Sequence, residues 1–195
     1  MGKISQDFYK NPDKYLLKLE NRITKYHNSL DRNLLRKAYY FSFNRHLFQL
    51  RDSGDPYAYH PYEVAKILAE LKFDITSIAT ALLHDTVEDG VATNCEIEKS
   101  FGQEIGNLVQ GVTKLSKIQL PDKEVREASN FSKFIIAVSE DIRVLLIKLA
   151  DRLHNMRTIS FVRDEKRRIN IAKETLEVYA PLAGRVGFQV MREEL

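Results

Sequence analysis

The fold is decided by HPYEVAKILAELKFDITSIATALLHDTVEDG, residues 60–90. Its first half places apolar side chains at helical spacing: Val64, Ile67, Leu68 and Leu71. Pro61 suits the first turn of that helix, where its missing N–H does no harm. Asp74 is a candidate N-cap for a second helix, ITSIATALLHD. Two consecutive helices joined by a short turn are therefore predicted.

The remaining sequence predicts helices on both sides of this pair. Candidate helices are LLRKAYYFSFNRHLFQL (34–50), TNCEIEKSF (93–101), EIGNLVQGVTKLSK (104–117), DIRVLLIKLADRLHNMRTI (141–159) and a last one from Asp164 to Tyr179, ending near Pro181. Thr93 and Glu96 form a capping box, and Gly102 ends that helix. SGDPY (53–57) is a turn, and polar residues 119–130 predict a flexible loop.

These elements predict an all-α fold, a helical bundle, in one domain spanning residues 1–195. Residues 1–37 are expected to form an N-terminal helical extension. We find no convincing strand alternation, no internal repeat and no second domain.

Composition limits the classes of protein that remain. The 195 residues are 44% hydrophobic and 29% charged, with a net charge of +3, which indicates a globular chain and does not favour nucleic acid as a partner. Cys95 is the only cysteine, which excludes a disulfide framework and favours a reducing, cytoplasmic location. No signal peptide is evident, and no apolar run approaches the roughly 20 residues of a membrane span.

Polar side chains interrupt the apolar helices at a few places. His84 and Asp85 follow the apolar run IATALL, and Glu88 and Asp89 come one turn later. Each of the pairs 84/88 and 85/89 shares a helix flank, since residues four apart are neighbours on a helix. Three carboxylates this close repel one another unless a cation neutralises them. A divalent metal explains the cluster most economically, although an acidic helix end is an alternative.

Two more polar residues stand out in apolar surroundings. Asp151 lies inside VLLIKLADRLHNM, with Asn155 one turn further on the same flank, and His60 lies just before a helix. Asp151 is equally well explained by an ion pair with Lys148 or Arg152, and a histidine beside a proline is usually a cap or a surface residue. Together with His84 and Asp85, these residues would make a two-His, two-Asp site suited to Mn²⁺, Fe²⁺, Zn²⁺ or, less well, Mg²⁺.

The order H…HD…D resembles that of the HD-domain phosphohydrolases. Longer segments resemble the hydrolase domain of RelA/SpoT-type enzymes: RDSGDPYAYHPYEVAKILAEL, ALLHDTVEDG, FGQEIGNLVQGVTKL, DIRVLLIKLADRLHNMRT and ETLEVYAPLAGRVG. The resemblance extends from Ala38 to Gly187. It implies an HD-domain helical bundle that removes the 3′-diphosphate of the guanosine alarmones ppGpp and pppGpp, releasing pyrophosphate. It also implies a small-molecule partner, with neither nucleic acid nor membrane involved.

The resemblance assigns a role to each matching position. His60, His84, Asp85 and Asp151 would hold one metal ion per chain, usually Mn²⁺, with Zn²⁺ or Fe²⁺ as alternatives. Glu88 and Asp89 would orient the attacking water and help to deprotonate it. Residues expected to bind the substrate are Arg51, which would stack on the guanine, Ser53, Asn155, Thr158, Tyr179, Lys148 and Arg157.

Two positions depart from the family pattern. Asp52 replaces a basic residue and is expected to repel a phosphate, and Phe48 replaces a small glycine and is expected to crowd the helix before the pocket or to fill a gap elsewhere. Two alternatives remain: hydrolysis of another nucleotide, and a relic that binds alarmone or docks a partner without turnover. Because no synthetase segment accompanies these motifs, we expect hydrolysis without synthesis. The sequence does not set an oligomeric state.

Overall fold

The helix pair predicted from residues 60–90 is present in the computed structural model, which describes residues 3–117 and 141–195. Helix α4 spans Tyr59–Glu70 and α5 spans Ile75–Glu88. The Asp74 carboxylate caps α5 by accepting a hydrogen bond from the Ser77 N–H, 2.9 Å away. Such a cap contributes about 1 kcal/mol to helix stability. The predicted N-cap is therefore confirmed.

Helices α5 and α9 form the interior of the bundle. Helix α9 spans Ile142–Arg157 and packs against α4, α5 and α7, while α5 packs against α3, α4 and α7. Residues 77–86 of α5 and 144–154 of α9 are buried without interruption. A helix that is buried on every side carries apolar residues all round, so each charged residue within it needs a partner.

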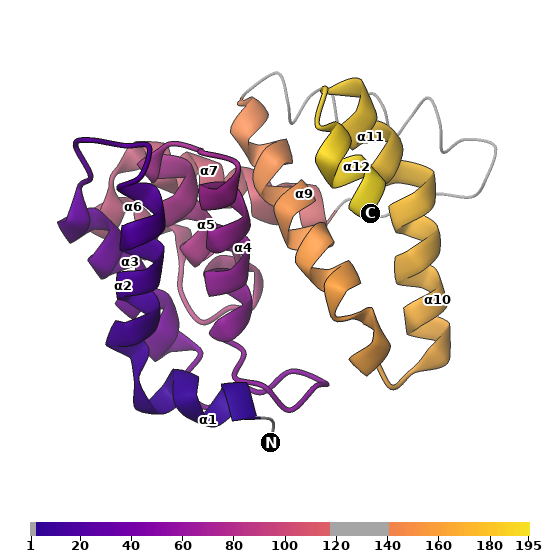
Figure 1. Cartoon of the computed structure of the whole chain (residues 1–195), viewed down its shortest axis with the longest axis horizontal. Helices are drawn as coiled ribbons and strands as arrows, with labels where there is room; N and C mark the ends of the chain where they lie inside the picture. The colour runs from indigo at the N-terminus through magenta and orange to yellow at the C-terminus, as the bar shows by residue number, and fades with distance from the viewer. Residues whose placement is uncertain (1–2, 118–140) are drawn as a thin grey trace.

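Further helices surround this pair in layers (Figure 1). They are α3 (Arg32–Arg45) and α7 (Gln103–Ser116), which pack on α5, α2 (Pro12–Ile23), which packs on α3 and α4, α1 (Lys3–Lys10), which packs on α2, and α6 (Asn94–Phe101), which packs on α7. The predicted capping box of Thr93 and Glu96 is present, and Gly102, with φ of 90°, ends α6. Helix α1 packs onto the bundle through Phe8, whose buried ring contacts the ring of Tyr59 in α4, with centroids 5.2 Å apart. The expected boundary of the N-terminal extension, residue 37, falls inside α3. The expected loop at residues 119–130 lies outside the described residues.

The prediction that the last helix ends near Pro181 is wrong. Helix α10 (Glu165–Glu174) runs into one wide π-helical turn at Thr175–Tyr179 and continues as α11 (Ala180–Arg185). Proline lacks an N–H and its ring clashes with the carbonyl one turn earlier, and the wider turn before Pro181 accommodates both. A short helix that the sequence did not indicate, α12 (Gln189–Glu194), follows.

The loop between α3 and α4 reaches toward the α9–α10 connection at the lower edge of Figure 1. Its turn is the predicted one: the N–H of Gly54 donates to the Arg51 carbonyl, and Gly54 has φ of 81°, which favours glycine. Phe48 is 92% exposed, so the expectation that it crowds the helix or fills a gap is wrong. Within the described residues, no helix has the length and apolar character needed to cross a membrane.

Candidate active site

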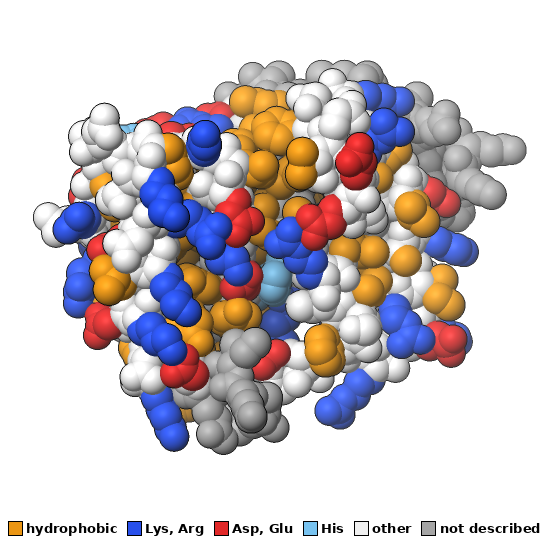
Figure 2. Space-filling model, in the orientation of Figure 1, with side chains coloured by type: hydrophobic (Ala, Val, Ile, Leu, Met, Phe, Trp, Pro, Cys, Tyr) orange, Lys and Arg blue, Asp and Glu red, His pale blue; other side chains and the backbone are white. Residues whose placement is uncertain are grey.

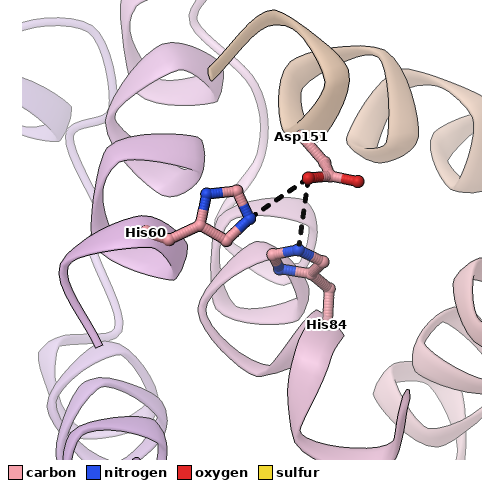
Figure 3. Close-up of side chains that lie close together, drawn as sticks. All are labelled: His60, His84 and Asp151. Carbon is pink, nitrogen blue, oxygen red and sulfur yellow. Dashed lines mark ion pairs between the residues drawn. The ribbon is translucent and has the colours of Figure 1, made fainter. Parts of the chain in front are cut away.

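The four predicted metal ligands converge from three helices. His60 comes from the first turn of α4, His84 from α5 and Asp151 from α9 (Figure 3). Asp85 follows His84 on α5. One Asp151 oxygen lies 3.1 Å from Nε2 of His60 and 4.0 Å from Nε2 of His84. The Asp85 carboxylate lies 2.9 Å from Nε2 of His84 and 3.4 Å from Nε2 of His60. Ligand atoms of His60, His84 and Asp151 thus all lie within 4.8 Å of one another, and the Asp85 carboxylate contacts both rings.

The histidine at position 84 is arranged as a metal ligand. Its Nδ1 lies 2.7 Å from the Ala81 carbonyl oxygen, which can only accept, so Nδ1 carries the proton. Its Nε2 is fully buried and has no hydrogen-bond partner. Because Nδ1 faces the backbone, Nε2 is the nitrogen that faces the carboxylates, which is how histidines that bind metals are oriented. The donor set of two imidazoles and two carboxylates fits a divalent transition metal.

The protonation states of the two histidines and the two carboxylates depend on one another. Burial disfavours a charged ring, but the carboxylates of Asp85 and Asp151 prevail and raise the pKa of His84 to about 9. In the same way, burial opposes ionisation of Asp85, yet His84 and His60 hold its pKa below the usual range. The pocket therefore keeps both carboxylates ionised, as metal ligation requires.

Asp151 has the ion-pair partner that was weighed as an alternative to a metal. Lys148, one turn earlier on α9, places its Nζ 2.7 Å from one Asp151 oxygen, while Asn155 donates to the other oxygen across 2.7 Å. Burial opposes the charge of Asp151, but Lys148, His60 and His84 together outweigh it and hold the pKa of this carboxyl well below the usual range. Lys148 contacts Oδ2, which leaves Oδ1, the oxygen that accepts from Asn155, directed at the two histidines, so the two interpretations of Asp151 are compatible. Arg152 instead pairs with Glu174, 2.6 Å away.

A cavity of about 540 Å³ opens over this group, a size typical of small-molecule sites. Figure 2 shows a recess between the two halves of the molecule, with charged side chains and a histidine around it. Glu88 and Asp89 both line the cavity. Burial and the nearby Asp85 carboxylate raise the pKa of Asp89, which makes it a stronger base than an ordinary aspartate.

Several residues expected to bind the nucleotide also line the cavity: Arg51, Ser53, Lys148, Asn155 and Thr158. The Arg51 guanidinium donates to the Asn155 side-chain oxygen across 2.6 Å. Hydrogen bonds of a guanidinium lie in its plane, so this contact leaves its flat faces for stacking. Asp52 lines the cavity too, and its carboxylate lies 3.4 Å from the Arg167 guanidinium. Arg167 therefore partly compensates the negative charge of Asp52, which was expected to repel a phosphate.

Two expected binding residues do not line the cavity. Arg157 forms a two-point ion pair with Glu194 of α12, at 2.5 and 2.8 Å. The buried ring of Tyr179 lies under the Arg152 guanidinium, 4.1 Å from the ring centroid. Their substrate contact is not supported by this arrangement, because Glu194 of α12 holds the Arg157 side chain and Arg152 of α9 covers the Tyr179 ring.

Two residues at the site were missed by sequence reasoning. The Tyr57 hydroxyl donates to an Asp85 oxygen across 3.1 Å, and Nδ1 of His154 lies 2.7 Å from Nδ1 of His60. Both residues are three positions from a predicted ligand, Tyr57 before His60 and His154 after Asp151. For His154 that spacing alone places it on the helix flank of Asp151, which was an available signal.

Comparison with known proteins identifies the class. Residues 38–189 match the model of the HD domain family, HD_4, so the chain belongs to the HD domain family. It is 54% identical over 177 residues to a Brucella melitensis protein named GTP pyrophosphokinase rsh, covering 91% of this chain and 24% of that protein. It is 51% identical over 161 residues to the bifunctional (p)ppGpp synthase/hydrolase SpoT of Escherichia coli, covering 83% of this chain and 23% of that protein.

A solved structure agrees with these matches. It is described as a metazoan ortholog of SpoT that hydrolyzes ppGpp, with a TM-score of 0.59 and 28% identity, covering 74% of this chain and 84% of that one. The predicted all-α HD-domain fold and the predicted resemblance to RelA/SpoT-type proteins are confirmed. The chain spans about a quarter of the length of the curated relatives it matches.

Proposed function

We propose that this chain is a Mn²⁺-dependent hydrolase that removes the 3′-diphosphate of ppGpp and pppGpp. The observation that carries the proposal is the buried, unpartnered Nε2 of His84 facing two carboxylates and a second imidazole at the base of a cavity. Relatives support the substrate class: one Escherichia coli protein, 51% identical over 161 residues, is named guanosine-3′,5′-bis(diphosphate) 3′-pyrophosphohydrolase. No feature of the cavity favours another nucleotide.

The metal would be held by His60, His84, Asp85 and Asp151. A bound divalent ion lowers the pKa of water and offsets charge on phosphoryl oxygens. The chain's own residues complete the chemistry. Glu88 or Asp89 accepts a proton from the attacking water, for which the raised pKa of Asp89 is suited. Water oxygen bonds to the phosphorus on the ribose 3′-oxygen, the bond between them breaks, and the 3′-oxygen leaves with a proton.

Three positively charged side chains that line the cavity would bind the substrate and stabilise its reacting phosphate. Lys148 and Arg152 line the cavity and carry permanent charge near the carboxylates, where they counter negative charge that builds on the phosphate. Arg51, held by Asn155, offers its flat face to the guanine. GDP or GTP and pyrophosphate are the products.

The test is incubation of the chain with ppGpp in Mn²⁺ and, separately, in EDTA, following GDP and pyrophosphate. We expect release of both products in Mn²⁺ alone, and none from Asp151→Asn. Binding of ppGpp without any product would overturn the proposal in favour of a binding protein. Faster hydrolysis of another nucleotide across a substrate panel would assign the site to that nucleotide.

A further inference from the structure

His154 contacts a proposed metal ligand, His60, and has no role in the proposed reaction. It is buried on α9, one turn beyond Asp151. Its Nδ1 is 2.7 Å from Nδ1 of His60 and 3.3 Å from Nη1 of Arg51. One nitrogen therefore contacts both a metal ligand and the arginine expected to stack on the guanine.

The arginine decides which histidine carries the shared proton. A guanidinium can only donate hydrogen bonds, so Nδ1 of His154 must offer a lone pair. Two nitrogens 2.7 Å apart need one proton between them, and His60 must then supply it from its own Nδ1. The neutral ring of His60 consequently keeps its Nε2 unprotonated.

That outcome matters because Nε2 is the ligand atom of His60. It lies 3.1 Å from Asp151 and 3.4 Å from Asp85. If the proton moved to Nε2, His60 would donate to Asp151 and its lone pair would be withdrawn from the metal position. In His84, the Ala81 backbone carbonyl accepts the Nδ1 proton and so keeps that proton on Nδ1. In His60, the acceptor for the Nδ1 proton is a side chain, that of His154.

We propose that His154 is a positioning residue that holds His60 in the tautomer able to bind the metal, and that it links this ligand to Arg51. The inference rests on the metal site of the proposed function. It adds a direct connection between the metal and the nucleoside side of the cavity: His60, His154 and Arg51 form one chain of hydrogen bonds. Partners that orient a ligand histidine typically change metal affinity by about 10–100-fold when removed.

Two variants separate hydrogen bonding from packing. His154→Leu removes the acceptor, whereas His154→Asn places an amide oxygen near the position of Nδ1 and should restore it. His27→Leu is the control, because His27 lies in the connection between α2 and α3 and contacts none of the site residues. The chain has five histidines, so ring nitrogen signals in long-range ¹H–¹⁵N spectra can be assigned with His60→Gln.

The first measurement is the tautomer of His60 in the metal-free wild type at mildly alkaline pH. We expect the proton on Nδ1, also in His154→Asn and His27→Leu, and a shift toward Nε2 in His154→Leu. A wild-type proton on Nε2 would overturn the inference, and this result needs no variant to fold.

The second measurement is the dissociation constant of Mn²⁺, from the resonance signal of free Mn²⁺. His154→Leu should bind about 10–100-fold more weakly, with His154→Asn and His27→Leu close to wild type and kcat of His154→Leu recovering at saturating Mn²⁺. Equal affinity for His154→Leu and wild type would refute the role of His154. Failure of the wild type to bind Mn²⁺ would instead refute the proposed function, whatever the tautomer of His60.

Discussion

Lys148 and the proposed metal would both contact the Asp151 carboxylate, so the variant Lys148→Met tests whether a metal binds there. The ammonium of Lys148, itself almost fully buried, lies 2.7 Å from an Asp151 oxygen. Removing one partner of a buried ion pair costs about 3–5 kcal/mol, because a buried charge is left without compensation. Asn155 still donates a hydrogen bond to Asp151 in the variant, so we expect the lower end of that range.

The loss of stability caused by Lys148→Met should depend on whether Mn²⁺ is bound. For a chain of this length, about 3 kcal/mol lowers the melting temperature by roughly 6–12 °C, which we expect for Lys148→Met in EDTA. In saturating Mn²⁺ the ion takes over the compensation of Asp151, and the loss should fall to about 1 kcal/mol. By linkage, Mn²⁺ must then bind the variant about 2 kcal/mol, or about thirtyfold, more tightly than wild type.

Thermal unfolding followed by circular dichroism, with and without Mn²⁺, measures both halves of this expectation. Lys66→Met is the matched control, because Lys66 pairs with Glu63 away from the cavity, and its loss should be the same in both conditions. An equal loss for Lys148→Met in Mn²⁺ and in EDTA would show that Lys148 and the metal do not share Asp151.

The other predictions address the acid–base pair, the cavity mouth, the packing and the pH response. Glu88→Gln should keep Mn²⁺ affinity and lose about 10²–10⁴-fold in kcat; equal loss of metal would mean that its role is misassigned. Asp52→Ala frees Arg167 from its ion pair and should lower KM for ppGpp, whereas an unchanged KM would show that neither charge contacts the ligand. Gly111→Ala would bring a Cβ within 2.7 Å of a Val144 methyl and should cost about 1–3 kcal/mol in urea unfolding, with partial rescue by Val144→Ala. Burial raises the pKa of all nine tyrosines, so their contribution to stability is complete below about pH 10 and is lost as the pH rises toward the folded values. Phenolate absorbance should therefore rise together with loss of helical dichroism, and ionisation near pH 10 with unchanged dichroism would contradict the burial.

Local chemistry explains why much of the fold could be predicted. The N-cap at Asp74, the capping box at Thr93 and the turn at Gly54 each depend on side chains or backbone angles within a few residues. The end of the helix at Pro181 could not be predicted in this way, because a wide turn in the preceding residues, stabilised by packing, lets the helix continue through the proline. Helix α12, which follows this segment, holds the Arg157 side chain outside the cavity through the ion pair between Arg157 and Glu194.

For the site, the sequence by itself determined which residues carry the chemistry, since burying a histidine or carboxylate in an apolar helix costs free energy unless a hydrogen bond, an ion pair or a metal compensates it. His84, Asp85, Glu88, Asp89 and Asp151 stood out on that ground, and the resemblance of the surrounding motifs added Arg51. Only the tertiary structure decided that α4, α5 and α9 bring His60, His84 and Asp151 together, and that Lys148 pairs with Asp151 without closing the site. The three-residue spacing from Asp151 places His154 on the right helix flank, but only the tertiary structure decided its contact with His60, because a hydrogen bond between residues 94 positions apart depends on how two helices pack.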